Sequence, residues 1–293
     1  MRMSKLIGLS LVVVALLGAS GCSLYTRTMV QKTAVDGAKA FQQRNYEEAE
    51  RLFREAIAAD PEFETEEAKL AERFLANTLQ AQFGINRKKT EKAEEAIKVF
   101  KSVIAKNPGD GRAFRALAGL LRAVGRDDEW LKLVTARAND PAVPGDQRAD
   151  VLTSLAARQF SCANEISDTE EVKKQVGDEY KFSKPAKEED FAKLKKCADE
   201  GMSLIDKALA LQKEANVESD STWSYKANLL IQKMRIAEME GDSANQQKLK
   251  AEAESAKEKY KVLVKKKQEE AQKKLLAESS VKAAQEQKDK ESK

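Results

Sequence analysis

The chain has 293 residues, with 52 Lys and Arg against 48 Asp and Glu, a formal net charge of +4 and no histidine. Without histidine there is no near-neutral imidazole acid or base, no Ser-His or Cys-His nucleophile, and no ligand of the commonest metal-binding type. We therefore predict a protein that is not an enzyme, with no catalytic residue, no metal and no freely bound cofactor. Walker-type phosphate loops, dinucleotide fingerprints and calcium loops are also missing from the sequence.

The N-terminus has the layout of an export signal. Arg2 and Lys5 precede an uncharged stretch from Leu6 to Leu17. That stretch is too short to span a bilayer, since a transmembrane helix needs roughly 20 apolar residues. Small residues follow from Gly18 to Gly21, and Cys22 comes next. A charged start, a short apolar core and small residues are typical of a signal peptide, which we place over residues 1–21.

The end of this segment resembles the lipobox of bacterial lipoproteins, because Ser20, Gly21 and Cys22 match its pattern, although Ala19 stands where leucine is most common. The resemblance implies a diacylglycerol, with a further acyl chain such as palmitate, on Cys22, and anchoring of the chain to a membrane. Ser23, where an aspartate would indicate the inner membrane, favours the outer membrane facing the periplasm. The alternative is cleavage by an ordinary signal peptidase, which would release a soluble periplasmic protein.

After a lipidated tether over 22–33, small and aromatic residues recur at helical spacing. Ala49, Phe53 and Ala56 share one face of a helix that Pro61 ends, and Gly37 is the small residue of the preceding helix. This pattern resembles the tetratricopeptide repeat (TPR), a pair of antiparallel helices. The resemblance implies an all-α solenoid of stacked helix pairs, which we place over residues 34–264.

The pattern returns twice in degenerate form. Ala96 and Phe100 keep the same spacing to Pro108 as in the first repeat, with Val103 at the last small position and Gly84 predicted at the small position of the first helix. The distance from Pro61 to Pro108 exceeds one repeat, so we expect insertions, with an extended turn over residues 86–90. A third repeat begins after Pro108 with Phe114 on its first apolar face, carries Trp130 where the family prefers alanine, and ends at Pro141.

The second half of the chain is less regular. A helix over about 146–162 is followed by a charged segment over 163–190 with few apolar residues, which we expect to be an irregular excursion or a mobile flap. Helix resumes at Phe191, and a turn at Gly241-Asp242 leads into a final helix from Ala244 to about Val264. Cys162 and Cys197 form an even pair in a chain predicted to be exported. They are either bridged by a disulfide or packed as two free thiols.

The C-terminal region carries the excess positive charge of the chain. From Lys257 to Lys293 there are 12 Lys against 7 Asp and Glu, a net of +5, which leaves the rest near neutral. We therefore expect no nucleic-acid partner. Residues 265–293 are predicted to be a charged tail, helical or disordered. Its Lys265–Lys267 cluster could touch anionic lipid head groups or cell-wall polymer, but a solvated tail is the favoured interpretation.

The function that these features indicate is a scaffold that binds a protein or peptide partner in the bacterial cell envelope. The inner face of a TPR solenoid is built mainly by the first helices of the pairs. The candidate partner-binding residues are therefore Lys39, Gln43, Arg115 and Arg122. One alternative is a component of outer-membrane or pilus assembly machinery, and another is a cell-wall enzyme or its regulatory subunit. The sequence does not indicate an oligomeric state.

Overall fold

The computed structural model describes residues 27–291, with side chains described to residue 280. The predicted signal peptide and Cys22 lie outside the described residues. The chain divides into two compact units, one up to Leu133 and one from Val134 on. This differs from the single repeat domain expected over 34–264. The boundary lies inside helix α6 (Asp127–Asn139), and each unit is described below by itself.

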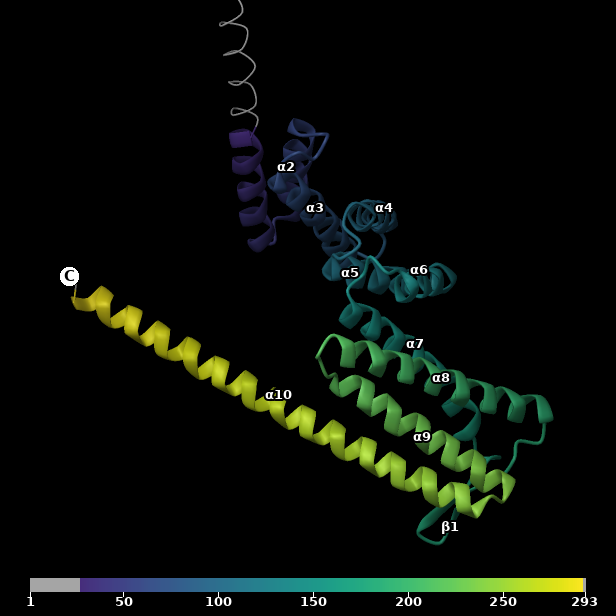
Figure 1. The fold of residues 1–293 in the computed structure, drawn as a ribbon. Helices are drawn as coiled ribbons and strands as arrows, with labels where there is room; N and C mark the ends of the chain where they lie inside the picture. Colours follow the sequence, from purple (N-terminus) through teal and green to yellow (C-terminus); the bar gives the residue numbers. More distant parts are fainter. Residues whose placement is uncertain (1–26, 292–293) are drawn as a thin grey trace, which may run out of the picture. The chain divides into compact units, whose positions relative to one another are not determined.

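Unit 1 is an all-α array of antiparallel helix pairs joined by short turns, and its fold is TPR-like, as predicted (Figure 1). It contains a helix over 27–42, then α2 (Tyr46–Ala59), α3 (Glu66–Ile85), α4 (Thr90–Lys106), α5 (Gly111–Ala123) and the first half of α6. The helix over 27–42, α3 and α5 are the first helices of the three pairs.

The first helix begins earlier than the sequence indicated. Residues 27–33, expected to belong to an extended tether, are helical. The reason is packing, because Val30 and Thr33 are buried on the same face as Gly37 and Ala40. Their spacings of three, four and three residues keep one stripe of the helix against the core.

The first helix pair has the packing that the TPR pattern predicts. Ala49, Phe53 and Ala56 of α2 are fully buried. Phe53 fills the space in front of Gly37, where an added Cβ would lie 2.8 Å from the Phe53 Cε1 atom. A glycine at residue 37 therefore allows the two helices to approach with the aromatic ring between them.

An aromatic cluster continues this core into the next pair. The Phe53 and Phe74 rings are stacked with centroids 5.6 Å apart. Phe41 meets Phe74 edge-on at 6.2 Å and Tyr46 at 5.4 Å. Such pairs stabilise a core beyond the area that they bury. The cluster joins the helix over 27–42, α2 and α3.

The second repeat is only partly as predicted. Ala96, Phe100 and Val103 of α4 are buried, and the turn over residues 86–89 lies where the extended turn was expected. Gly84, in contrast, is not the small contact residue of α3, because it is exposed and an added Cβ would meet nothing within 4 Å. The inserted residues lengthen α3 to 20 residues. Alignment on Pro108 therefore places Gly84 in the last turn of α3, beyond the packed part.

Carboxylates organise the loops between pairs in unit 1. Both oxygens of the buried Asp60 accept hydrogen bonds, from the amides of Glu64 and Thr65 and from the Thr65 hydroxyl. Thr65 in turn caps α3 by accepting from the Ala68 amide. Burial alone would raise the pKa of Asp60, but these hydrogen bonds outweigh it and hold that pKa below its usual value.

Unit 2 consists of four long helices and one hairpin. Its elements are α7 (Gly145–Ser167), β1 (Lys173–Val176), β2 (Glu179–Phe182), α8 (Glu188–Glu214), α9 (Asp220–Glu240) and α10 (Ser243–Glu291). Helix α8 packs on both α7 and α9, and α10 packs on α9 (Figure 1). Gly201 permits a close approach, since an added Cβ there would lie 2.6 Å from Leu229 Cδ2.

The segment expected to be irregular is ordered by a β-hairpin. Strands β1 and β2 pair antiparallel, with Val176 opposite Glu179 across a two-residue turn in which Gly177 has φ 64°. Val172 and Phe182, at the base of the hairpin, pack on the core that contains Phe191. The segment over 163–190, expected to be an irregular excursion or a mobile flap, therefore contains regular secondary structure.

Helix α10 extends far past the end that the sequence indicated, about residue 264. It runs to Glu291, and the expected tail is helical rather than disordered (Figure 1). Leu249, Ala253, Ala256 and Leu263 are buried, whereas every side chain from 265 to 280 is exposed. The extension consists mostly of Lys, Glu, Gln and Ala. These residues are strong helix formers, so they favour a helix even where no face of it is packed.

Candidate functional site

The four predicted partner-binding residues all lie in unit 1, and all are exposed. Lys39 forms an ion pair of 3.2 Å with Asp36 on its own helix, and Gln43 lies in the turn that follows. Arg115 and Arg122 lie seven residues apart on α5. The structure thus brings Arg115 and Arg122 onto one helix face, and Lys39 and Gln43 belong to a different helix pair.

Helix α5 buries one face and exposes the opposite one. Ala113, Phe114, Leu117, Leu120 and Leu121 are buried, whereas Arg112, Arg115, Gly119 and Arg122 are exposed on the far side, with the exposed Ala123 at its edge. At 100° per residue these four positions fall within an arc of about 80°. We call Arg112, Arg115 and Arg122 the arginine stripe.

Arg112 was not among the candidates of the sequence analysis, although the third repeat was expected to start after Pro108. The signal that extends α5 to Gly111 is Asp110, whose Oδ1 accepts from the amides of Arg112 and Ala113 as the N-cap. Burial would raise the pKa of Asp110, but these amides and the ion pair with Arg73 hold that pKa below its usual value.

The absence of nearby acids distinguishes the arginine stripe from four other arginines of unit 1, and the stripe shares this absence with the exposed Arg27, Arg44 and Arg87, which lie on other segments. Arg51, Arg54, Arg73 and Arg126 each form ion pairs with carboxylates, at N–O distances between 2.6 and 3.1 Å for the pairs with Glu48, Glu95, Asp110 and Glu94. Among the described residues, no carboxylate lies within 4.0 Å of a guanidinium of the stripe. Only Arg122 has an aromatic neighbour, the buried Trp130, whose ring centroid lies 5.4 Å away.

Charges on the second helices are largely used within the fold. Glu50 of α2 accepts from Lys92 at 2.8 Å, from Arg54 at 2.8 Å and from Gln82 at 2.9 Å, which ties α2, α3 and α4 together. Arg126 pairs with Glu129, and this hydrogen bond is the main reason that the pKa of Arg126 is raised. These groups position helices and are not available to a partner.

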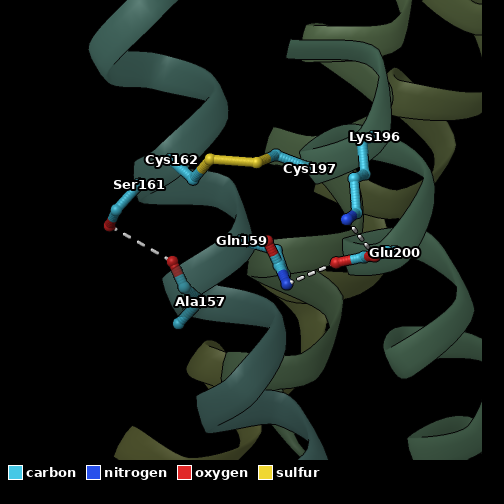
Figure 2. Close-up of a disulfide and its surroundings, with 7 residues drawn as sticks. All are labelled: Ala157, Gln159, Ser161, Cys162, Lys196, Cys197 and Glu200. Atoms are coloured by element: carbon cyan, nitrogen blue, oxygen red, sulfur yellow. Dashed lines mark hydrogen bonds and ion pairs between the residues drawn. A yellow bond between two sulfur atoms is a disulfide. The ribbon is translucent and has the colours of Figure 1, made fainter. Parts of the chain in front are cut away.

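Unit 2 contains a disulfide between Cys162 of α7 and Cys197 of α8, with a Cα–Cα distance of 6.1 Å (Figure 2). Of the two alternatives that the sequence left open, the structure has the bridge. One turn away, Gln159 donates to Glu200 at 2.8 Å, again between α7 and α8 (Figure 2). The bridge closes the loop that carries the hairpin, so its evident role is structural.

A wide groove of about 960 Å³ lies where α10 passes the turn between α8 and α9. Its walls combine Trp223 and Leu263 with charged side chains, of which Lys267 and Asp220 pair at 3.4 Å. The buried Gln212 lines it and donates to Thr222, while its Oε1 lacks a partner in the structure. The groove has no consistent charge or apolar character that would define a ligand. Lys266 and Lys267 of the predicted basic cluster are part of its rim.

Among the described residues, the shifted carboxylate pKa values all move in one direction. Every carboxylate with a shifted pKa has it lowered, namely Glu48, Glu50, Asp60, Asp110, Glu129 and Asp168. A general acid at neutral pH needs a raised pKa instead. Within the same part of the chain, three or more potential metal ligands do not gather anywhere, and no helix is long and apolar enough to cross a membrane.

Comparisons with known proteins give a likeness of fold only. No family model and no curated protein matches the chain. Among solved structures, it is similar to Pseudomonas aeruginosa pilF, with 15% identity and a TM-score of 0.34, over 76% of this chain and 90% of that one. It is also similar to a tetratricopeptide repeat protein from Parabacteroides merdae, with 12% identity and a TM-score of 0.34, over 81% and 98%.

Proposed function

We propose that this protein is a non-catalytic TPR-like scaffold that binds a protein partner in the bacterial cell envelope and is held at a membrane by lipid on Cys22. One observation carries the binding function. The second helices of unit 1 pair most of their charges within the fold, with exceptions such as Lys98, and the first helix α5 presents an exposed face whose three arginines have no carboxylate partner. An exposed polar face without a structural role is a candidate for binding.

The partner-binding half of the proposal is tested by site-specific photocrosslinking in intact cells. Gly119 is a suitable position for benzoylphenylalanine, because it is exposed and an added Cβ meets nothing within 4 Å. Lys98, exposed on the second helix α4, is the matched control. We expect a discrete protein crosslink from residue 119 and none from residue 98. Equal crosslinking at both positions, or none at either, would contradict a binding face on α5.

The anchor is tested separately, by metabolic labelling with a tagged fatty acid. We expect label on the wild-type chain and none on Cys22→Ala, which should also leave the membrane fraction. A single acyl chain anchors a protein only marginally, so a multiply acylated cysteine is required to hold the protein firmly at the membrane. Equal labelling of the wild type and of Cys22→Ala would rule out lipid on Cys22. The identity of the crosslinked protein then decides whether the scaffold belongs to an outer-membrane or pilus assembly machinery.

A further inference from the structure

The arginine stripe is electrostatically unfavourable in the isolated protein. Helix α5 has no acidic residue, in its first turn or elsewhere. Arg112 lies next to its N-terminus, where the helix dipole disfavours a positive charge. Arg112 and Arg115 are three residues apart, which places two like charges side by side. Apart from the contact of Arg122 with the Trp130 ring, the packing of α5 does not involve these charges, because they lie opposite its buried face.

The stripe also offers open access. Gly119 lies between Arg115 and Arg122, and the space where its Cβ would be is empty to at least 4 Å. The three guanidinium groups therefore flank a stretch of helix that no side chain covers. From residue 112 to residue 122 the helix rises about 15 Å, which matches roughly five residues of extended chain.

We propose that the arginine stripe, Arg112, Arg115 and Arg122, binds an acidic segment of the partner protein, with aspartate or glutamate carboxylates on the guanidinium groups. This inference rests on the proposed scaffold function and specifies the chemistry of its partner. Guanidinium groups bind carboxylates through paired, charge-assisted hydrogen bonds. Such a segment would neutralise the repulsion that the free stripe carries.

A protein segment fits this face better than an anionic lipid surface. Helices that lie in a membrane interface insert large apolar side chains beside their basic residues. The exposed large apolar residues of unit 1 are Met29, Val35, Leu70, Ile85 and Leu131, and none of them is on α5. The face offers charge and shape but no apolar group for insertion.

The test uses the full chain in neutral detergent micelles and a fluorescein-labelled hexaglutamate peptide, with hexaglutamine as the uncharged control. The test variant is Arg112→Gln, Arg115→Gln and Arg122→Gln combined. The matched control variant, Lys88→Gln, Lys98→Gln and Lys132→Gln, removes the same charge from exposed positions of unit 1 outside α5. Helical circular dichroism verifies that both variants remain folded.

We expect fluorescence anisotropy to show hexaglutamate binding that weakens at least tenfold in the arginine variant and less than twofold in the lysine variant. Hexaglutamine should not bind. Equal losses in the two variants would mean nonspecific attraction by net charge and would overturn the proposal. The proposal would also be overturned if micelles doped with phosphatidylglycerol displaced the peptide and bound to the protein through the three arginines.

Failure of this inference is distinguishable from failure of the scaffold function. The crosslink from residue 119 reports a partner of any charge. A crosslink that persists in the arginine variant would leave the scaffold standing and remove the acidic-segment proposal. A crosslink that disappears in the arginine variant and persists in the lysine variant supports both.

Discussion

Units 1 and 2 are both helical and both have ion pairs between helices, such as Lys233 with Asp199 in unit 2, but they differ in their other interactions. In unit 1, short helices pack through small residues and one aromatic cluster, and ion pairs such as Glu50 with Lys92 join neighbouring helices. In unit 2, long helices are joined by a disulfide, and a hairpin closes one end of its core. The regular repeats of unit 1 are thus held by the packing of their small and aromatic side chains. Unit 2, which departs from the repeat, also has a covalent bond between two of its helices.

The two tryptophans make this comparison measurable. Trp130 lies in unit 1 and Trp223 in unit 2, and the sequence has no other. A Trp223→Phe background therefore reports unfolding of unit 1, and a Trp130→Phe background reports unit 2. Each prediction below refers to urea unfolding followed by fluorescence in the appropriate background.

The largest expected effect is that of Phe53→Ala in unit 1. The ring is fully buried, stacks on Phe74 and fills the space at Gly37. Its removal leaves a cavity, and we expect a loss of about 3–5 kcal/mol in the free energy of unfolding. The Trp223 signal of unit 2 should be unchanged. A loss below about 1 kcal/mol would show that the aromatic cluster is not the centre of unit 1.

The disulfide is the corresponding element of unit 2. Its sequence separation is 35 residues, so the loop-entropy relation predicts a loss of about 3–4 kcal/mol when Cys162→Ala and Cys197→Ala are combined. The loss should appear in the Trp223 signal and not in that of Trp130. Reduction of the wild type with dithiothreitol should reproduce it. If the two signals shift equally, the bridge does not act on unit 2 alone.

Glycines at close contacts should respond in the same direction in both units. A methyl group at residue 37 would press on Phe53, and one at residue 201 would press on Leu229. Overpacking of this kind typically costs about 1–3 kcal/mol. We expect Gly37→Ala to destabilise unit 1 and Gly201→Ala to destabilise unit 2, each in its own tryptophan signal. A neutral result at either position would show that the facing side chain can move aside.

Acid sensitivity is a way to sharpen the description of unit 1. The pKa of Asp60 is lower in the folded chain than its unfolded value of about 3.9. The stabilisation is therefore present above that value and is lost as the pH falls through the folded pKa. We expect Asp60→Asn to cost about 1–3 kcal/mol at neutral pH, because the NH₂ group that replaces one carboxylate oxygen cannot accept from Glu64 or Thr65. The variant should also show a weaker fall in stability below pH 4, and an unchanged slope would contradict the assignment.

The sequence predicted the packing of a segment correctly where that segment has the regular spacing of the repeat. Gly37, Ala49, Phe53 and Ala56 were placed correctly because their spacing fixes one helix face. Gly84 was misplaced because the alignment ran back from Pro108, whereas the added residues lengthen α3. A spacing rule holds only when the inserted residues lie outside the packed part of the repeat.

Two features of the second half had weaker signals. Val176-Gly177-Asp178-Glu179 has the composition of a two-residue hairpin turn, but the charges around it resemble those of a solvated loop. The helical continuation past residue 264 follows from helix propensity alone, which decides little without an apolar stripe. In the binding face, Arg112 was missed for a local reason, namely that the cap at Asp110 was not recognised.

The smallest expected effect has the opposite sign and separates packing from binding. Gly119 is an exposed glycine inside a helix, with no neighbour that excludes a side chain. Gly119→Ala should therefore stabilise unit 1 by about 0.5–1 kcal/mol, since alanine loses less conformational entropy in a helix. Gly37→Ala, in the same unit, is the matched comparison and is expected to lower the stability instead. If Gly119→Ala is destabilising instead, residue 119 has a packing role, and the open stretch between Arg115 and Arg122 would not exist for a partner to approach.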